Sequence, residues 1–168
     1  TSHVDVDARR AIEKDFPLTE AEVAVITEGS DPLAAVTELV GRRVPHWFMG
    51  WRDVTKPANE RTVLASVMPR AGFNHKTPLF WFPQRLEPAH SACFLASMNA
   101  LVTDFVARQK MGGTSLGMFI MKQLPALPPS SYGVRDMEFI VPRVLELTYT
   151  AYDVRPWARA LGYGGEPF

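Results

Sequence analysis

Residues 91–110 read SACFLASMNALVTDFVARQK, and this stretch decides the fold that the sequence predicts. Large apolar residues recur in it every three or four positions, which is the spacing of one face of an α-helix. The residues of this face are Phe94, Met98, Leu101 and Phe105. Gly112 and Gly113 follow, and glycine is typical of the position just after a helix end. The pattern predicts one long central helix over residues 91–110 whose apolar face lies in the core.

Two segments before this helix have the composition of β-strands. Residues 44–54 and 60–68 are rich in aromatic, β-branched and small residues, and Lys56-Pro57-Ala58-Asn59 between them is turn material. A polar loop at residues 71–76 leads to the apolar run 78–82, where a further strand can form. We therefore expect an α+β fold in which a small, mainly antiparallel sheet packs on the central helix.

Helices are expected to close the C-terminal end of the fold. A second apolar segment, residues 115–124, ends at the proline-rich run 125–129. Residues 136–153 predict a further helix, in which Pro142 is expected to be tolerated only near the first turn. A short helix at residues 155–161, ended by Gly162, completes the chain.

Residues 1–43 are predicted to be an acidic, mainly helical leader to a domain over residues 44–168. Thr19 is a suitable N-cap with Glu22 three residues later, and Asp31 followed by Pro32 indicates a second helix start. Neither end of the sequence resembles a natural terminus. We therefore expect the chain to be a piece of a longer polypeptide.

The composition is that of one soluble globular domain. The 168 residues are 46% hydrophobic and 21% charged, and no apolar run approaches the roughly 18 to 20 residues needed to span a bilayer. The start of the chain also lacks the pattern of a signal peptide. We therefore expect a cytoplasmic protein without a membrane partner.

The single cysteine, Cys93, lies in an apolar helical pattern and is predicted to be a buried core thiol.

The net charge of zero hides a strong segregation of charge along the chain. Residues 1–41 carry three basic and nine acidic side chains, a net charge of −6. Residues 42–76 carry seven basic and two acidic side chains, a net charge of +5, and residues 77–168 are close to balance at +1. The compact basic stretch favours a phosphate-contacting surface, although chance segregation or pairing between subunits gives the same pattern.

The motifs of a complete enzyme are missing from the sequence. It contains no Asn-Pro-Pro-Tyr-type or Pro-Cys methylase site, no glycine-rich loop for S-adenosylmethionine, no GxxxxGK[ST], no GxSxG and no HExxH. Asp53 and Glu60 flank a turn as in a nuclease, but the lysine that such a site needs is absent after Glu60. The histidines His3, His46, His75 and His90 match no metal-ligand spacing. We therefore expect no catalytic residue, no cofactor and no metal site in this chain.

Several blocks of sequence together resemble one family. They are Gly50-Trp51-Arg52-Asp53-Val54-Thr55, Asn59-Glu60-Arg61-Thr62-Val63-Leu64-Ala65-Ser66, residues 95–110, the Gly112-Gly113 break, residues 120–129, residues 143–151 and residues 162–168. In order and spacing they resemble the C-terminal target-recognition region of adenine-N6 DNA methylases from type IIG-like restriction-modification and phage-defence systems. The layout of helix, glycine break and prolines is also similar to type I specificity subunits. The resemblance covers the chain from about residue 44 onward.

The resemblance implies a non-catalytic reader of DNA. It implies double-stranded DNA as the partner, and a methylase domain with its S-adenosylmethionine upstream on the natural polypeptide. The basic stretch would supply the contacts, because arginine forks read bases and mobile cations anchor phosphates. The candidate DNA-binding residues are Arg52, Lys56, Asn59, Arg61, Arg70, Asn74, His75, Lys76, Arg108 and Lys110.

The sequence leaves structural explanations open for many of these residues. Asp53 and Glu60 can pair with the arginines of the hairpin, and cations at the end of the central helix complement its dipole. Four aromatic residues can stack on bases but are expected rather in the core: Trp47, Trp51, Trp81 and Phe82. The rival function is a docking module that binds its own methylase or a partner subunit through the acidic and basic segments.

Overall fold

The computed structural model describes residues 19–22, 24, 33–34, 37–38, 41, 44–82 and 86–168. The chain divides into two compact units, Thr1–Pro45 and His46–Phe168. In the first unit, residues 20–22 are helical, and the hydroxyl and N–H of Thr19 both donate to the Glu22 carboxylate. The predicted capping pair is therefore confirmed. The predicted helix start at Asp31 and Pro32 lies outside the described residues, as do Arg42 and Arg43 of the basic stretch.

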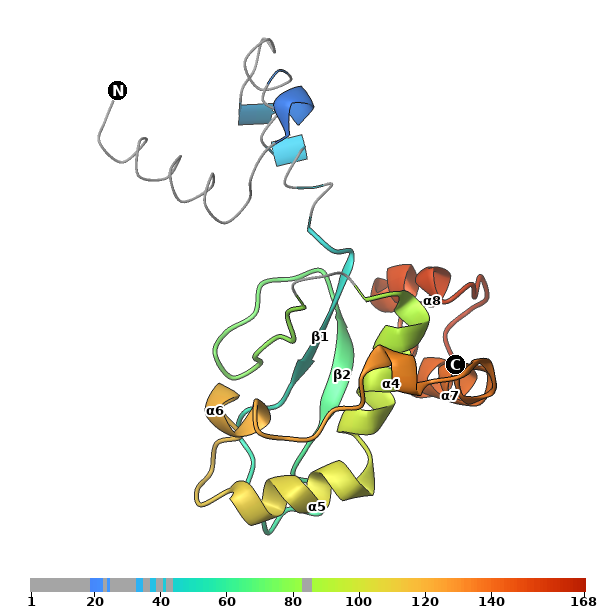
Figure 1. The fold of residues 1–168 in the computed structure, drawn as a ribbon. Coiled ribbons are helices and arrows are strands. Elements are labelled where there is room, and N and C mark those ends of the chain that lie inside the picture. Colours follow the sequence, from blue (N-terminus) through green and yellow to red (C-terminus); the bar gives the residue numbers. More distant parts are fainter. Residues whose placement is uncertain are drawn as a thin grey trace, which may run out of the picture. The chain divides into compact units, whose positions relative to one another are not determined.

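The second unit contains a two-stranded antiparallel sheet (Figure 1). Strand β1 (Trp47–Trp51) pairs with β2 (Ala65–Pro69), so that Trp47 lies opposite Pro69 and Trp51 lies opposite Ala65. On the other edge of β1 the expected further strand is reduced to an isolated bridge between Gly50 and Leu79. The predicted α+β class, with its small antiparallel sheet, is confirmed.

Gly50 lets three segments of chain meet at this bridge. A Cβ atom at this position would collide with the Pro78 carbonyl oxygen and with the end of the Met68 side chain. The bridge is closed by hydrogen bonds from the Trp51 N–H to the Pro78 oxygen, at 3.1 Å, and from the Phe80 N–H to the Met49 oxygen, at 2.8 Å. Glycine is required here because the neighbouring backbone approaches so closely.

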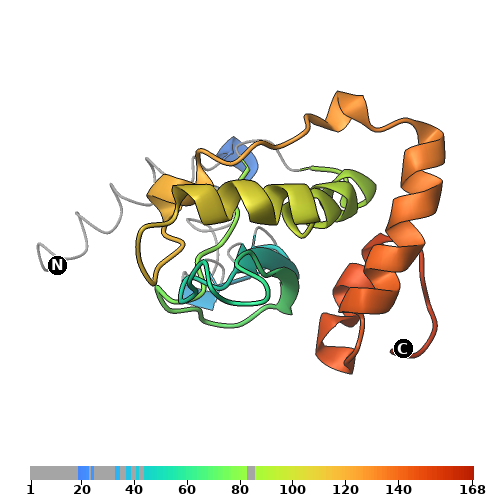
Figure 2. The ribbon, with the colours of Figure 1, turned by 90° about the horizontal axis from the view of Figure 1, so that it is seen from below.

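The rest of the second unit is mainly helical, and the predicted C-terminal helices are present, although the one predicted over residues 136–153 runs from Val134 to Thr148. The elements are α4 (Pro88–Met98), α5 (Leu101–Lys110), α6 (Met118–Met121), the 3-10 turn η1 (Pro129–Ser131), α7 (Val134–Thr148), the 3-10 turn η2 (Tyr152–Val154) and α8 (Arg155–Ala160). Gly162 follows α8 with a φ of 84°, a left-handed conformation suited to the end of a helix. Figures 1 and 2 show α5 and α7 at opposite ends of the unit, with α4 between them.

The predicted central helix is two helices instead of one. Ala100 between α4 and α5 is extended, with φ −67° and ψ 146°, so the chain changes direction there. The preceding residue, Asn99, has a low helix propensity, and its side chain bonds to backbone outside the helix. Because of this break, α5 buries Thr103, Asp104 and Ala107, whereas the predicted core residues Leu101 and Phe105 are exposed.

Pro142 lies in the middle of α7, which corrects the expectation that it belongs near the first turn. Proline lacks the N–H that would bond four residues back, so the helix loses one internal hydrogen bond at this point. The Arg143 side chain donates a hydrogen bond of 2.7 Å to the Phe139 carbonyl oxygen and lies over the Phe139 ring. A side chain therefore supports the backbone next to the proline.

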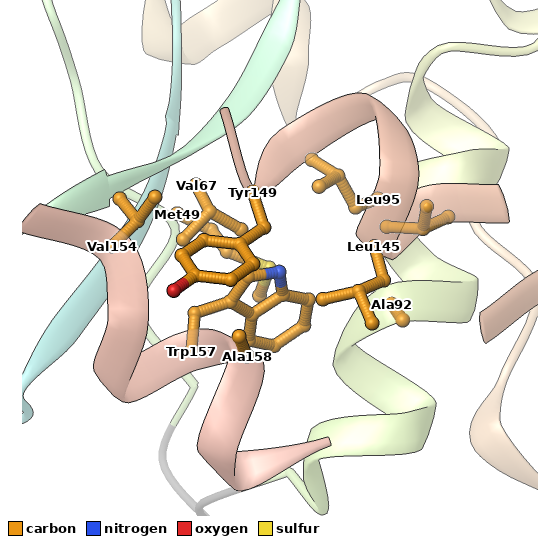
Figure 3. Close-up of a cluster of buried hydrophobic side chains, with 10 residues drawn as sticks. Met49, Val67, Ala92, Leu95, Leu145, Tyr149, Val154, Trp157 and Ala158 are labelled. Carbon is orange, nitrogen blue, oxygen red and sulfur yellow. The ribbon is translucent and has the colours of Figure 1, made fainter. Parts of the chain in front are cut away.

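Two apolar clusters form the core of the second unit. The first, shown in Figure 3, joins Met49 and Val67 of the sheet to α4, α7 and α8 around Trp157. The second joins Trp51 and Val63 to α5, α6 and the segment that follows α6. Ala65, Phe80 and Phe94 pack against both clusters. The two clusters are therefore continuous through the sheet and α4.

Candidate nucleic-acid interface

The loop between β1 and β2 carries four of the ten candidate DNA-binding residues. The Asn59 N–H donates to the Lys56 carbonyl oxygen at 3.0 Å, which confirms the predicted turn. The side-chain amide of Asn59 donates to the Thr55 hydroxyl at 3.2 Å, and Lys56 is exposed. The turn therefore presents a cation and an amide at the tip of the hairpin.

Arg52 lies on the same loop and is exposed. Its guanidinium donates to the Arg61 carbonyl oxygen and to the Thr55 hydroxyl, both at 3.4 Å. The hairpin thus brings Arg52 and Arg61 together as predicted, although the contact is to the backbone of Arg61. These long bonds leave the exposed guanidinium able to meet a further acceptor.

A second turn, at residues 74–77, lies against this loop. The Asn74 side-chain oxygen accepts from the Lys76 N–H at 2.9 Å, and the Asp53 N–H donates to the Lys76 carbonyl oxygen at 3.0 Å. Lys76 Nζ is 3.8 Å from Asp53 Oδ2, and the Ser115 hydroxyl donates to Asp53 Oδ1 at 2.5 Å. Asn74, His75 and Lys76 are exposed, whereas Asp53 is buried.

Arg70 lies at the other end of the sheet. It follows Pro69, which is opposite Trp47, whereas Arg52 follows Trp51 at the far end of β1. A strand rises about 3.3 Å per residue, which separates the two arginines by roughly 20 Å along the sheet. The structure therefore brings Arg52, Lys56, Asn59 and Lys76 together and places Arg70 away from them.

Asp104, which the sequence analysis did not single out, holds the hairpin loop from inside. One carboxylate oxygen accepts the N–H groups of Thr62 and Val63, each at 2.8 Å. The other accepts Arg108 Nε at 2.7 Å, and Arg61 Nε is 3.5 Å from the first oxygen. Arg61 Nε is buried without a hydrogen bond, so its attraction to Asp104 is purely electrostatic.

The two arginines beside Asp104 continue the same set of contacts. Arg108 donates to the carbonyl oxygens of Pro57, at 3.0 Å, and of Glu60, and Arg61 donates to the carbonyl oxygen of Asn99. The Asn99 side chain pairs with both backbone groups of Ala65, at 2.9 and 3.1 Å. We call Asp104, Arg61, Arg108 and Asn99 the Asp104 anchor. The sequence contains one signal for this cluster, because Asp104 lies within an apolar helix pattern and a buried acid needs partners.

Hydrogen bonding keeps Asp104 charged although it is buried. Burial raises the pKa of its carboxyl, but hydrogen bonds from the Val63 N–H, the Arg108 guanidinium and the Thr62 N–H lower it by more, and the charge of Arg108 adds to them. The pKa of Asp104 therefore lies below its ordinary value. At neutral pH the anchor is held together by a carboxylate and two guanidinium groups.

The remaining candidates are divided between surface and core. Lys110 is exposed, with Nζ 3.4 Å from the Gln123 side-chain oxygen. Trp51 is buried and Trp47 packs edge-on against Trp157, as expected of core residues, whereas Trp81 is 68% exposed. Cys93 is buried as predicted, and this burial, followed by the charge of Asp136, raises the pKa of its thiol.

Over the part of the chain that the structure describes, no three His, Cys, Asp or Glu side chains are grouped so that they could hold a metal ion. Within the same residues no helix has the length and apolar character needed to cross a membrane. No protein-family model, curated protein or solved structure matches the chain.

Proposed function

We propose that this chain is a non-catalytic DNA target-recognition module of a restriction-modification or phage-defence adenine methylase. Its DNA-facing surface is the hairpin loop, residues 52–61, with the turn at residues 74–76. The observation that carries the proposal is the distribution of charge at this end of the hairpin. Arg52, Lys56 and Lys76 are exposed, whereas Asp53 is buried and already bonded, which leaves Glu60 as the one exposed acid in residues 44–82.

Such a surface suits the two tasks of a DNA reader. Lysines contact phosphates as mobile point charges, and each contact releases counterions from the duplex. An exposed arginine fork and the amides of Asn59 and Asn74 offer the donors and acceptors that base edges require. Both kinds of side chain occur here on two adjacent turns.

The first test measures binding of this chain to duplex DNA as a function of salt. At physiological salt we expect the 10⁻⁴ to 10⁻⁶ M typical of nonspecific binding, so the titrations begin at low salt. Lys56→Ala and Lys76→Ala should each reduce the slope of log K against log salt by about one. Arg159→Ala, which removes an exposed cation from α8, is the matched control and should leave the slope unchanged.

Sequence reading is tested in the longer polypeptide that the resemblance implies. If Arg52 forks to a guanine, Arg52→Ala should cost roughly 1 to 3 kcal/mol of binding and relax the choice at one base position. The proposal fails if alanine at Arg52, Lys56 and Lys76 leaves affinity, salt slope and site preference unchanged in a folded protein.

A docking module of the same type of enzyme is the second candidate function. It is favoured by the outer face of α5, where Leu101, Val102 and Phe105 are 73, 71 and 63% exposed. Apolar groups that share one face of a helix often mark a protein interface. If docking is the function, Phe105→Ser should weaken association with the methylase part supplied as a separate chain, and it should not change the salt slope of DNA binding.

A further inference from the structure

The Asp104 anchor contacts the hairpin loop almost entirely through the backbone of the loop. Asp104 accepts from the N–H groups of Thr62 and Val63, and Arg108 donates to the carbonyl oxygens of Pro57 and Glu60. Among the candidate DNA-binding residues of the loop, only the side chain of Arg61 is taken up by the anchor, and those of Arg52, Lys56 and Asn59 are not. Lys56 and Glu60 face solvent while the backbone beside them is held from within.

Arg108 has no nitrogen left without a partner. Nε donates to Asp104, Nη1 to Pro57 and Nη2 to Glu60, and the side chain is 29% exposed. A guanidinium reads a phosphate or a guanine through a fork of two parallel N–H groups. This fork is already occupied by the protein's own carboxylate and carbonyl groups.

We infer that Asp104 and Arg108 are positioning residues for a DNA-reading edge formed by Arg52, Lys56 and Asn59, and that Arg108 does not contact DNA. This inference rests on the function proposed above. A loop that is ordered before binding avoids the entropy cost of ordering it on the duplex, and it presents its side chains in a fixed geometry. The anchor supplies that order to residues 57–63, which have no strand or helix structure of their own.

The first measurement follows amide hydrogen exchange in the chain without DNA. Asp104→Asn and Arg108→Gln should speed exchange at Thr62 and Val63 by about tenfold, because the first replaces their carboxylate acceptor by a weaker amide oxygen and the second removes the arginine that holds this acceptor in place. Tyr132→Phe is the control, since it removes the bond between the Tyr132 and Ser97 hydroxyls at a site away from the loop. It should leave exchange at Thr62 and Val63 unchanged.

The second measurement compares DNA binding of Arg108→Gln, Arg108→Lys and Lys56→Ala. A positioning role predicts that both Arg108 variants lose affinity by about tenfold at every salt concentration while the salt slope stays as in the wild type. Lys56→Ala should instead lower the slope by about one. If Arg108→Gln also lowers the slope and Arg108→Lys restores it, Arg108 contacts phosphate and the inference is wrong.

The two measurements separate this inference from the proposed function. If the wild-type chain binds no duplex even at low salt, the proposed function fails, and the reading edge fails with it whatever the exchange data show. If the wild type binds but exchange at Thr62 and Val63 is unchanged in Arg108→Gln, the positioning role alone is overturned. If Asp104→Asn does not fold, both measurements can be made with Arg108→Gln and Arg108→Lys.

Discussion

Both ends of the β1–β2 sheet pack in an apolar cluster, but the Trp51 end is held in addition by hydrogen bonds from polar side chains. At the Trp47 end, Trp157 packs edge-on against Trp47 with ring centroids 4.6 Å apart, within an apolar cluster. At the Trp51 end, β2 begins at Ala65, both of whose backbone groups bond to the Asn99 side chain. Apolar contacts depend on area and volume, whereas hydrogen bonds depend on the presence of each partner. The first end should therefore respond to lost volume and the second to a lost partner.

The largest effect is expected at the apolar end. Trp157→Ala removes a side chain with no solvent exposure from the centre of the cluster in Figure 3. We expect the free energy of unfolding, measured with urea, to fall by about 3 to 5 kcal/mol. Trp81→Ala is the matched control, because Trp81 is 68% exposed and should change stability by less than about 0.5 kcal/mol. Equal losses in the two variants would contradict the placement of Trp157 in the core.

Asp104→Asn should give the second largest loss of stability, and the size of this loss should depend on pH. The change weakens the contacts to two N–H groups and two arginines, and we expect a loss of about 3 kcal/mol at neutral pH. The folded pKa of Asp104 lies below the unfolded value of about 3.9, so its contribution is complete above that value and is lost as the pH falls through the folded pKa.

Urea unfolding of wild type and Asp104→Asn between pH 7 and pH 3 measures this contribution. The difference between the two proteins should shrink only in acid. Asp153→Asn, at an exposed carboxyl, should differ little from the wild type at any pH. A difference that grows in acid would show that the carboxylate form of Asp104 does not stabilise the fold.

Gly50 links the two ends, because its neighbours Met49 and Trp51 belong to different clusters. Gly50→Ala places a methyl group against the Pro78 carbonyl and should cost about 1 to 3 kcal/mol in urea unfolding. Gly72→Ala is the control, since a Cβ there meets no atom within 4 Å. A stability change at Gly72 as large as that at Gly50 would mean that the close approach at Gly50 is not the cause.

The smallest effect tests a polar contact at the apolar end. Trp157 Nε1 donates to the Thr148 hydroxyl at 3.0 Å, and Thr148→Val removes this acceptor while keeping the shape of the side chain. We expect a loss of about 1 kcal/mol in urea unfolding, because the substitution removes this neutral bond, and the bond from the Thr148 hydroxyl to the Val144 carbonyl oxygen four residues back adds little to stability. A loss larger than that of Asp104→Asn would reverse the contrast between the two ends.

The sequence predicted those parts of the fold that local patterns determine. The strand pair, the turn from Lys56 to Asn59, the Thr19 cap and the burial of Met98 follow from spacing and residue type within short windows. The prediction of one continuous helix was wrong at Asn99 and Ala100, and with it the predicted buried face of residues 101–110. The apolar spacing continued through Asn99, whereas the side chain of Asn99 bonds to a distant strand. The apolar spacing along a helix carries no information about a contact between Asn99 and a distant strand.

The candidate site was predictable to a similar degree. The composition predicted the basic loop and its turn. The role of its cations in binding DNA stays a prediction. The partners of Arg61 were not visible, because Asp104 and Asn99 lie in another part of the chain. The pair of Asp104 and Arg108 has the i,i+4 spacing of neighbours on one helix, whereas the bonds of Arg108 to the hairpin loop were not visible either. The sequence left open that Asp53 and Glu60, the acids nearest in sequence, pair with the arginines of the hairpin. Only the packing of α5 against the loop selects Asp104 instead.

The same separation along the chain sets the order in which the protein can fold. The Asp104 bonds join residues 41 and 42 positions apart, and the Asn99 bonds to Ala65 span 34 positions. Closing a loop of this length costs entropy before any contact compensates for it, so we expect these bonds to form after the local turn at residues 56–59 and the helices. We therefore expect the Thr62 and Val63 amides to gain protection late in refolding. During synthesis, the hairpin loop would become ordered only after α5 has been made.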